Sequence, residues 1–254
     1  MDRKKNSGFI FSKLVDLFKV SESDDTGIKI VACDLENDVS VKRAQKLKDK
    51  GNIVLGIGIL PFFAVGEKSL MMALQRAENL ARIADGCFLI NKEAIRSKKS
   101  ISSLLFQEQL LAVEAEVDKI VLNIETGLSD ILLSGYINID SSVIKDALQD
   151  CGTFKVIRGS GEGSDRMEMA LKEAFDQALS ERIDINTAHK LIIKGLISED
   201  KELKMEELGE FQEFISTLPN NVEVIFGFSN CKIDKAELEI VMLVIGAEPI
   251  LREV

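Results

Sequence analysis

The sequence predicts an α/β fold of two lobes joined by one long helix, and three observations support this. Between residues 28 and 90, short apolar runs of strand length alternate with amphipathic helical stretches, the order that is typical of a parallel sheet. A long stretch of helical periodicity then runs from about Ser102 to Leu133. Strands and helices alternate again up to Ile245. With 254 residues, 46% of them hydrophobic, the chain can bury a proper core.

The first lobe follows a strand–helix–strand–helix–strand order. The expected elements are a strand over Ile28–Cys33, a helix over Val41–Lys50, a strand over Ile53–Leu60, a helix over Glu67–Ala84 and a strand over Cys87–Ile90. Gly56 and Gly58 interrupt the second strand, and they indicate close packing of a neighbouring helix rather than a ligand loop. Met71 and Met72 on the second helix are expected to fill the core.

The central helix carries apolar residues on most sides, which predicts a buried helix. Before it, the basic cluster Arg96–Lys99 is expected to be a solvated loop. After it, Ser141 or Ser142 is expected to cap a helix that ends at Gly152. The remaining expected elements are a strand over Phe154–Ile157, a helix over Met167–Leu179, a strand over Leu191–Ile197, a helix over Lys204–Leu218, and strands over Val222–Phe228 and Leu238–Ile245.

The expected organisation has four parts. They are an N-terminal helix with an acidic linker over residues 1–27, the first lobe over 28–100, the central helix over 101–136 and a C-terminal domain over 137–254. The apolar face of the N-terminal helix is formed by Phe11, Leu14, Val15 and Phe18. Residues 1–20 hold five basic and two acidic side chains, against the acidic trend of the chain. Such a helix either packs on the sheet, makes a peripheral membrane contact or binds a partner, and the sequence leaves these open.

Charge and cysteine usage exclude several classes of function. Asp and Glu total 42 against 32 Lys and Arg, and a formal charge of −10 argues against nucleic acid as a partner. The four cysteines are far apart, no two form a CxxC pair, and His189 is the single histidine. We therefore expect no metal site, no cofactor and no Cys–His catalysis. Free thiols and the lack of about 18 uninterrupted apolar residues predict a cytoplasmic protein.

The segment Gly159–Ser164 is rich in glycine, follows a strand and opens a helix. That is where backbone N–H groups and the helix dipole bind phosphate. However, Glu162 and Asp165 would repel a phosphate, and no lysine follows at Walker spacing. A tight structural turn is the favoured interpretation, as packing or surface placement is for His189.

Several segments, in this order, resemble the FtsZ branch of the FtsZ/tubulin family. They are Leu60–Phe62 with Gly66, Thr126–Leu132, Gly135–Asp140, Gly159–Arg166, Val224–Gly227 and Val244–Gly246. The order and spacing hold from about Ile28 to Ala247. The resemblance implies a partial Rossmann-like parallel-sheet lobe without the family's N-terminal nucleotide-binding strands, a central helix, and a C-terminal α/β domain with a four-stranded mixed sheet. It also implies cytoskeletal filaments and bacterial cell division.

Departures from the family affect its nucleotide-binding half. The phosphate loop, a glycine-rich run in the family, falls on Asp34–Ser40, which has no glycine and three carboxylates. Glycine lets backbone N–H groups approach phosphate closely, and carboxylates repel it. A glutamate and an arginine that line the family's nucleotide fall on Val65 and Ser69, and only Asn91 matches a family nucleotide contact.

The family's catalytic loop is altered as well. In the family it projects into the nucleotide site of the neighbouring subunit, where an asparagine and two acids position the attacking water. Asn138 and Asp140 match the asparagine and the first acid, but the second acid falls on Val143, which cannot orient water.

The sequence therefore predicts a non-catalytic FtsZ-like protein without GTP binding. We expect it to act through association with FtsZ or with itself as a homo-oligomer, with Asn138 and Asp140 on the partner-facing loop and capping or modulation of FtsZ filaments as one outcome. One alternative is a GTP-binding, polymer-forming protein that a partner chain completes. Another is a membrane-attached scaffold that uses the N-terminal helix.

Overall fold

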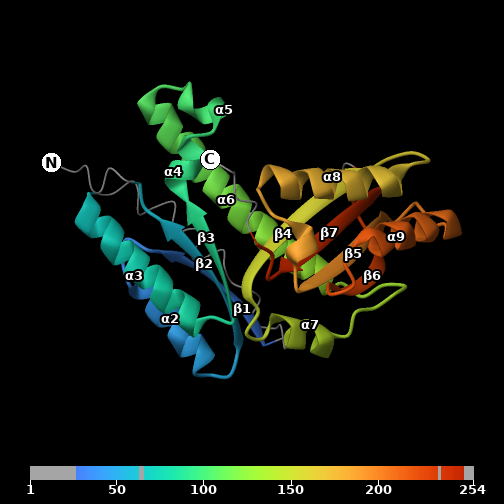
Figure 1. Ribbon diagram of the computed structural model, residues 1–254, viewed down its shortest axis with the longest axis horizontal. Coiled ribbons are helices and arrows are strands. Elements are labelled where there is room, and N and C mark those ends of the chain that lie inside the picture. The colour runs from blue at the N-terminus through green and yellow to red at the C-terminus, as the bar shows by residue number, and fades with distance from the viewer. Residues whose placement is uncertain (1–26, 63–65, 234–235, 249–254) are drawn as a thin grey trace. The chain divides into compact units, whose positions relative to one another are not determined.

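The computed structural model describes residues 27–62, 66–233 and 236–248 (Figure 1). The expected helix over 9–20, with its apolar face of Phe11, Leu14, Val15 and Phe18, lies outside the described residues. The chain divides into two compact units, of which the first ends at Val121 and the second begins at Leu122. Both units combine helices with a sheet, so the predicted α/β class is confirmed.

The described part of the first unit contains three parallel strands in the order β1-β2-β3. Their bounds are Ile28–Asp34 for β1, Ile53–Leu60 for β2 and Gly86–Asn91 for β3. Two helices make the crossover connections, α2 over Val39–Lys48 and α3 over Glu67–Ile83. These elements match the predicted ones to within about two residues at each end, the usual uncertainty of helix and strand boundaries.

Close packing explains the two glycines of β2. A Cβ atom at Gly56 would lie 2.9 Å from the side chain of Leu80 on α3, and one at Gly58 would lie 2.6 Å from Leu89. The expectation of close helix packing at Gly56 is thus confirmed. The prediction that Met71 and Met72 fill the core is wrong, because their exposed fractions are 66% and 44%. The buried face of α3 is set by Ala73, Ala77 and Leu80, and the methionines lie off that face.

The segment between β3 and the long helix is more helical than predicted. It holds α4 over Lys92–Arg96 and α5 over Lys99–Ser102, so the basic cluster Arg96–Lys99 joins two short helices and is not simply a loop. Ion pairs then connect the segment to α6, which spans Phe106–Ile131. Lys92 contacts Glu114 at 2.7 Å and Lys98 contacts Glu116 at 3.0 Å.

Helix α6 is buried along one face only. Its buried residues follow a spacing of three and four: Val113, Val117, Val121, Ile124, Leu128 and Ile131. Leu111 and Leu122 are 70% and 58% exposed, so the expectation of burial on most sides is wrong. A helix contacts its surroundings through the residues of one stripe, and apolar composition alone does not show how wide that stripe is.

The second unit is built on a mixed sheet with the order β4-β7-β5-β6 in its described residues. The strands are β4 over Gly152–Gly161, β5 over Lys190–Ser198, β6 over Glu223–Cys231 and β7 over Leu238–Ile245. Strand β7 pairs antiparallel with β4 and β5, and β5 pairs parallel with β6. Strand β5 is central and buried along most of its length, which explains its near-continuous apolar run.

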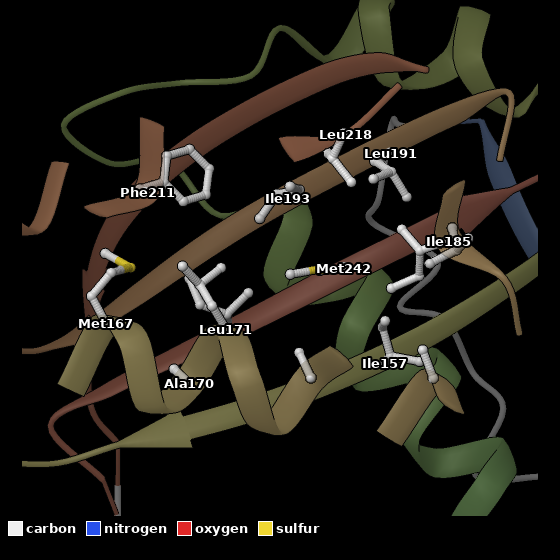
Figure 2. Close-up of a cluster of buried hydrophobic side chains, with 14 of the residues drawn as sticks. Ile157, Met167, Ala170, Leu171, Ile185, Leu191, Ile193, Phe211, Leu218 and Met242 are labelled. Atoms are coloured by element: carbon white, nitrogen blue, oxygen red, sulfur yellow. The ribbon is translucent and has the colours of Figure 1, made fainter. Parts of the chain in front are cut away.

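Helices cover both faces of this sheet. Besides the end of α6, the described part of this unit contains α7 over Ser141–Leu148, α8 over Arg166–Ser180, the 3₁₀ helix η2 over Ile185–Thr187, and α9 over Met205–Thr217. Helices α8 and α9 pack over one face, where Ile157, Leu171, Phe211 and Met242 belong to the core (Figure 2). On the opposite face, Val156 lies against Gly127 of α6.

Candidate functional site

Backbone amides of the loop that follows β1 are hydrogen-bonded to acceptors within the protein. The Glu36 amide donates to the Asp34 carboxylate at 3.0 Å, and the Val39 amide donates to the side-chain oxygen of Asn37 at 3.1 Å. The Leu35 amide donates to the Ile59 carbonyl at 3.1 Å. Three of the amides that a phosphate loop would offer to a ligand are therefore already bonded within the protein.

Arg76 of α3 holds the same loop from the carbonyl side. One guanidinium nitrogen, Nη1, donates to the carbonyls of Leu35 and Glu36, both at 2.9 Å. A hollow of about 360 Å³ lies here, at the carboxyl ends of β1 and β2, and it is lined by Glu36, Pro61, Ser69, Met72 and Arg76. Ser69 lines this hollow together with Glu36, whereas Val65 is outside the described residues.

Asn91 ends β3 and caps helix α4. Its side-chain oxygen accepts hydrogen bonds from the amides of Glu93 at 3.0 Å and Ala94 at 3.2 Å. The side-chain oxygen of Asn91, which the resemblance aligns with a nucleotide contact of the family, is thus engaged in an N-cap, a role in which asparagine is among the most favoured residues. Asn91 belongs to the first unit, whereas Asn138 and Asp140 belong to the second.

Asn138 and Asp140 shape the loop that joins α6 to α7. The Gly135 amide donates to the side-chain oxygen of Asn138 at 2.7 Å. The Asp140 carboxylate accepts from the amide and the hydroxyl of Ser142, both at 2.8 Å, and these bonds lower the pKa of Asp140. Asp140 is therefore the N-cap of α7, in place of the predicted Ser141 or Ser142, and a carboxylate held this way is a weak base.

The same loop and the first turn of α7 present apolar side chains to solvent, and the sequence did not predict their exposure. Tyr136 is 62% exposed, Leu133 is 40% exposed, and Val143 on the first turn of α7 is 39% exposed. Tyr136 is the single tyrosine of the chain, and this was the available signal. Exposed aromatic residues are frequent anchors at protein interfaces.

The glycine-rich segment is a packing element. Gly159 and Gly161 belong to β4, so the strand extends beyond its predicted end at Ile157. A Cβ atom at Gly159 would lie 1.9 Å from the Ala170 carbonyl oxygen of α8. Of the three glycines in this segment, Gly163 alone has a positive φ, 78°, and it lies in the bend before α8. The structural interpretation is confirmed, with a strand and a turn where a turn alone was expected.

A carboxylate of the protein occupies the amino end of α8. The Gly163 amide donates to the Glu237 carboxylate at 3.0 Å, and Lys201 pairs with the same side chain at 2.7 Å. Arg166 forms a buried ion pair with Glu207, whose closest N–O distance is 2.5 Å. A phosphate at this turn would have to displace Glu237.

Other candidate chemistry is sparse in the described part of the chain. No group of three or more His, Cys, Asp or Glu side chains there is arranged to hold a metal ion. The four cysteines are free thiols, and burial raises the pKa of Cys33 to about 12 and that of Cys87 to about 11. Both therefore stay protonated near neutral pH and are poor nucleophiles. Within the same residues, no helix is long and apolar enough to span a membrane.

Comparisons with known proteins agree with this architecture. No protein-family model matches the chain. It is 25% identical over 179 residues to the cell division protein FtsZ of Porphyromonas gingivalis, which covers 70% of this chain and 38% of that protein. It is 25% identical over 186 residues to FtsZ of Aquifex aeolicus, covering 72% and 49%. A solved structure of an empty FtsZ dimer from M. jannaschii superposes with a TM-score of 0.68 at 21% identity, covering 92% of this chain and 67% of that chain. The chain is therefore similar in sequence to part of FtsZ, and it has the fold of the FtsZ/tubulin family.

The match is partial in length. The chain spans about half or less of the FtsZ proteins of P. gingivalis and A. aeolicus. The resemblance aligns the loop over residues 34–40 with the family's phosphate loop and the loop over 133–140 with its catalytic loop, and this alignment stays a prediction. In both loops, side chains of the loop accept hydrogen bonds from backbone amides of the same loop or of the helix that follows it.

Proposed function

We propose that this chain is a non-catalytic member of the FtsZ/tubulin family that acts by binding other subunits, either FtsZ or copies of itself. The observation that carries the proposal is the internal bonding of the loop over residues 34–40. Its amides at Glu36 and Val39 donate to side chains of the loop, and Arg76 holds its carbonyls. A phosphate would have to break these bonds before it could bind.

The negative charge of the 34–40 loop also opposes phosphate binding. Asp34, Glu36 and Asp38 lie within five residues of one another along the loop. At about 5 Å, one carboxylate repels one phosphate charge by about 1 to 3 kcal/mol at effective dielectric constants between those of water and a protein surface. The second candidate phosphate site is occupied by Glu237. At both places, carboxylates of the chain therefore oppose the binding of a nucleoside triphosphate.

The loop over residues 133–140 is the proposed contact with a partner subunit. In the family this loop docks onto the nucleotide face of the next subunit, and here it presents Tyr136 and Leu133 to solvent. The chain would dock through this loop on one end of an FtsZ filament, while its own 34–40 loop offers no nucleotide to the next subunit. An interface that cannot be repeated ends a filament. Val143 in place of the second acid would also slow GTP hydrolysis at that end.

Nucleotide titration tests the non-catalytic part of the proposal. Calorimetry of the purified chain with GTP and with GDP, in the presence of Mg²⁺, should give no binding heat at micromolar concentrations. Micromolar binding of either nucleotide would refute this part and favour a GTP-binding protein that a partner chain completes.

Polymerisation of FtsZ from the same organism tests the association part. Substoichiometric amounts of the chain should shorten FtsZ filaments and lower GTP turnover per FtsZ. Because Asn138 and Asp140 hold the loop in shape, the test variant is Tyr136→Lys, which changes only an exposed side chain. It should abolish the effect, whereas Asn220→Lys at another exposed position should not. Identical polymerisation with and without an equimolar amount of the chain would exclude capping, and self-association would then be measured by sedimentation.

A further inference from the structure

The loop over residues 133–140 is held tightly against β6. Ile137 and Phe228 exchange two backbone hydrogen bonds, at 3.2 and 3.0 Å, as neighbouring antiparallel strands do. A Cβ atom at Gly135 would lie 2.2 Å from the Ser229 hydroxyl and 2.3 Å from the Phe228 carbonyl oxygen, so this close approach requires glycine. Contacts with β6 therefore fix the position of the loop.

A buried lysine lies under the start of this loop. Lys194 of β5 has an exposed fraction of 0%, and its Nζ donates to the Leu133 carbonyl at 2.6 Å. The Ser229 hydroxyl donates to the same carbonyl at 3.2 Å. In the described part of the chain, no Asp or Glu forms an ion pair with Lys194. Burial lowers the pKa of Lys194, the sign of an ammonium group removed from water at a cost.

Core packing does not explain a lysine here. Its neighbours on β5, Ile192, Ile193 and Leu196, are buried apolar residues, and another of the same kind would avoid the cost of burying an amine. The ammonium group instead interacts favourably with the negative end of the α6 helix dipole, because Leu133 lies two positions after the last residue of α6. The lysine thus connects the end of α6 to β5 at one particular place.

We propose that Lys194 is a positioning residue that fixes the 133–140 loop against β5 and β6, so that Leu133 and Tyr136 are presented to a partner in a single arrangement. The partner-binding consequence rests on the proposed function above. The ordering of the loop does not, and it can be measured on the chain alone.

Tyr136 is a native probe for this measurement. The chain has one tyrosine and no tryptophan, so its tyrosine fluorescence arises from the loop alone. Lys194→Met keeps the length of the side chain and removes the donor, whereas Lys194→Gln keeps an N–H donor. The matched control is Lys190→Met on the same strand, whose side chain is 22% exposed and pairs with Glu223 at the surface.

Time-resolved anisotropy of Tyr136 and amide hydrogen exchange are the two readouts. In Lys194→Met we expect a larger amplitude of nanosecond motion at Tyr136 and at least tenfold faster exchange at Gly135 and Ile137, with exchange in α8 and α9 unchanged. Lys194→Gln should restore part of the order, and Lys190→Met should match the wild type. Unchanged loop exchange in Lys194→Met, or equal loosening of α8 and α9, would overturn the proposal.

Two further measurements keep the proposal testable. Ser229→Ala removes only the weaker donor and should leave the loop ordered. If it loosens the loop while Lys194→Gln does not, Ser229 is the anchor and the proposal is wrong, even if Lys194→Met fails to fold. Association with FtsZ should fall in Lys194→Met and stay intact in Lys190→Met. A loop that loosens without loss of association would refute the docking role and leave the positioning role standing.

Discussion

Substitution of Gly159 by alanine tests directly whether the glycine-rich segment is a packing element or a ligand loop. The added Cβ atom would lie 1.9 Å from the Ala170 carbonyl oxygen and 2.4 Å from the Ala174 amide nitrogen. Both are backbone atoms of α8, so no side-chain rotation relieves the contact. Helix α8 would have to move away from β4 by about 1.5 Å to reach ordinary van der Waals separation.

That movement disturbs a close-packed interface. Ala170 and Ala174 are fully buried against β4, and their contacts would be lost over the length of the helix. Overpacking of this kind costs about 1 to 3 kcal/mol, and we expect a value near the upper limit because the helix backbone itself has to shift. The reduced entropy of the unfolded alanine chain offsets only about 0.5 to 1 kcal/mol of this cost.

Urea unfolding followed by circular dichroism measures the effect. The matched control is Gly209→Ala in α9, where no atom lies within 4 Å of the position that the alanine Cβ would take. Alanine at a helix interior is favoured by about 1 kcal/mol, so this control should become more stable while Gly159→Ala becomes less stable. If Gly159→Ala unfolds at the same urea concentration as the wild type, the packing argument is wrong and a ligand role for the segment has to be reconsidered.

Two further predictions concern ionisable side chains of the second unit. Glu207→Leu leaves the guanidinium of Arg166, which is 3% exposed, without its main partner. The free energy of unfolding in urea should therefore fall by about 3 to 5 kcal/mol. Adding Arg166→Met should recover most of this loss, and equal instability of the single and double variants would contradict the prediction. Burial raises the pKa of Glu125 to about 7, so the folded state should lose stability as the pH rises from about 5 through 7. Glu125→Gln should remove this pH dependence in melting curves at pH 5.5, 7 and 8.5, and a parallel dependence in both proteins would show that another group is responsible.

The sequence located nearly all the strands, because buried strands read as uninterrupted apolar runs. β2 and β7 have the bounds that the sequence predicts. The sequence predicts an end of β4 at Ile157, because Arg158 and the glycine residues that follow are not apolar, whereas the strand extends to Gly161. Arg158 nevertheless lies within the strand, and it is held there by Asp130 at 2.6 Å and Glu239 at 2.7 Å. Partners this distant along the chain cannot be recognised from local composition.

In the candidate site, too, residue types predict some features, and tertiary contacts determine others. The residue types at Asp34–Ser40, with three carboxylates and no glycine, are the basis of the prediction that this loop does not bind phosphate. The engagement of Asn91 and Asp140 as helix N-caps was not predicted, because a side chain that matches a family position can serve a local role instead. Tyr136 and Lys194 were not singled out, since one exposed aromatic residue and one lysine within an apolar run acquire meaning only from their surroundings.

The sequence by itself determined the order of helices and strands, the family resemblance and the absence of glycine from residues 34–40. These follow from residue type and spacing, which act over a few neighbours along the chain. Only the tertiary structure decided that the amides of the 34–40 loop bond to its own side chains, that Glu237 fills the turn before α8 and that Lys194 lies beneath Leu133. The physical reason is that the two latter contacts join residues more than 60 positions apart, and that loop amides bind whichever acceptor the fold brings within reach.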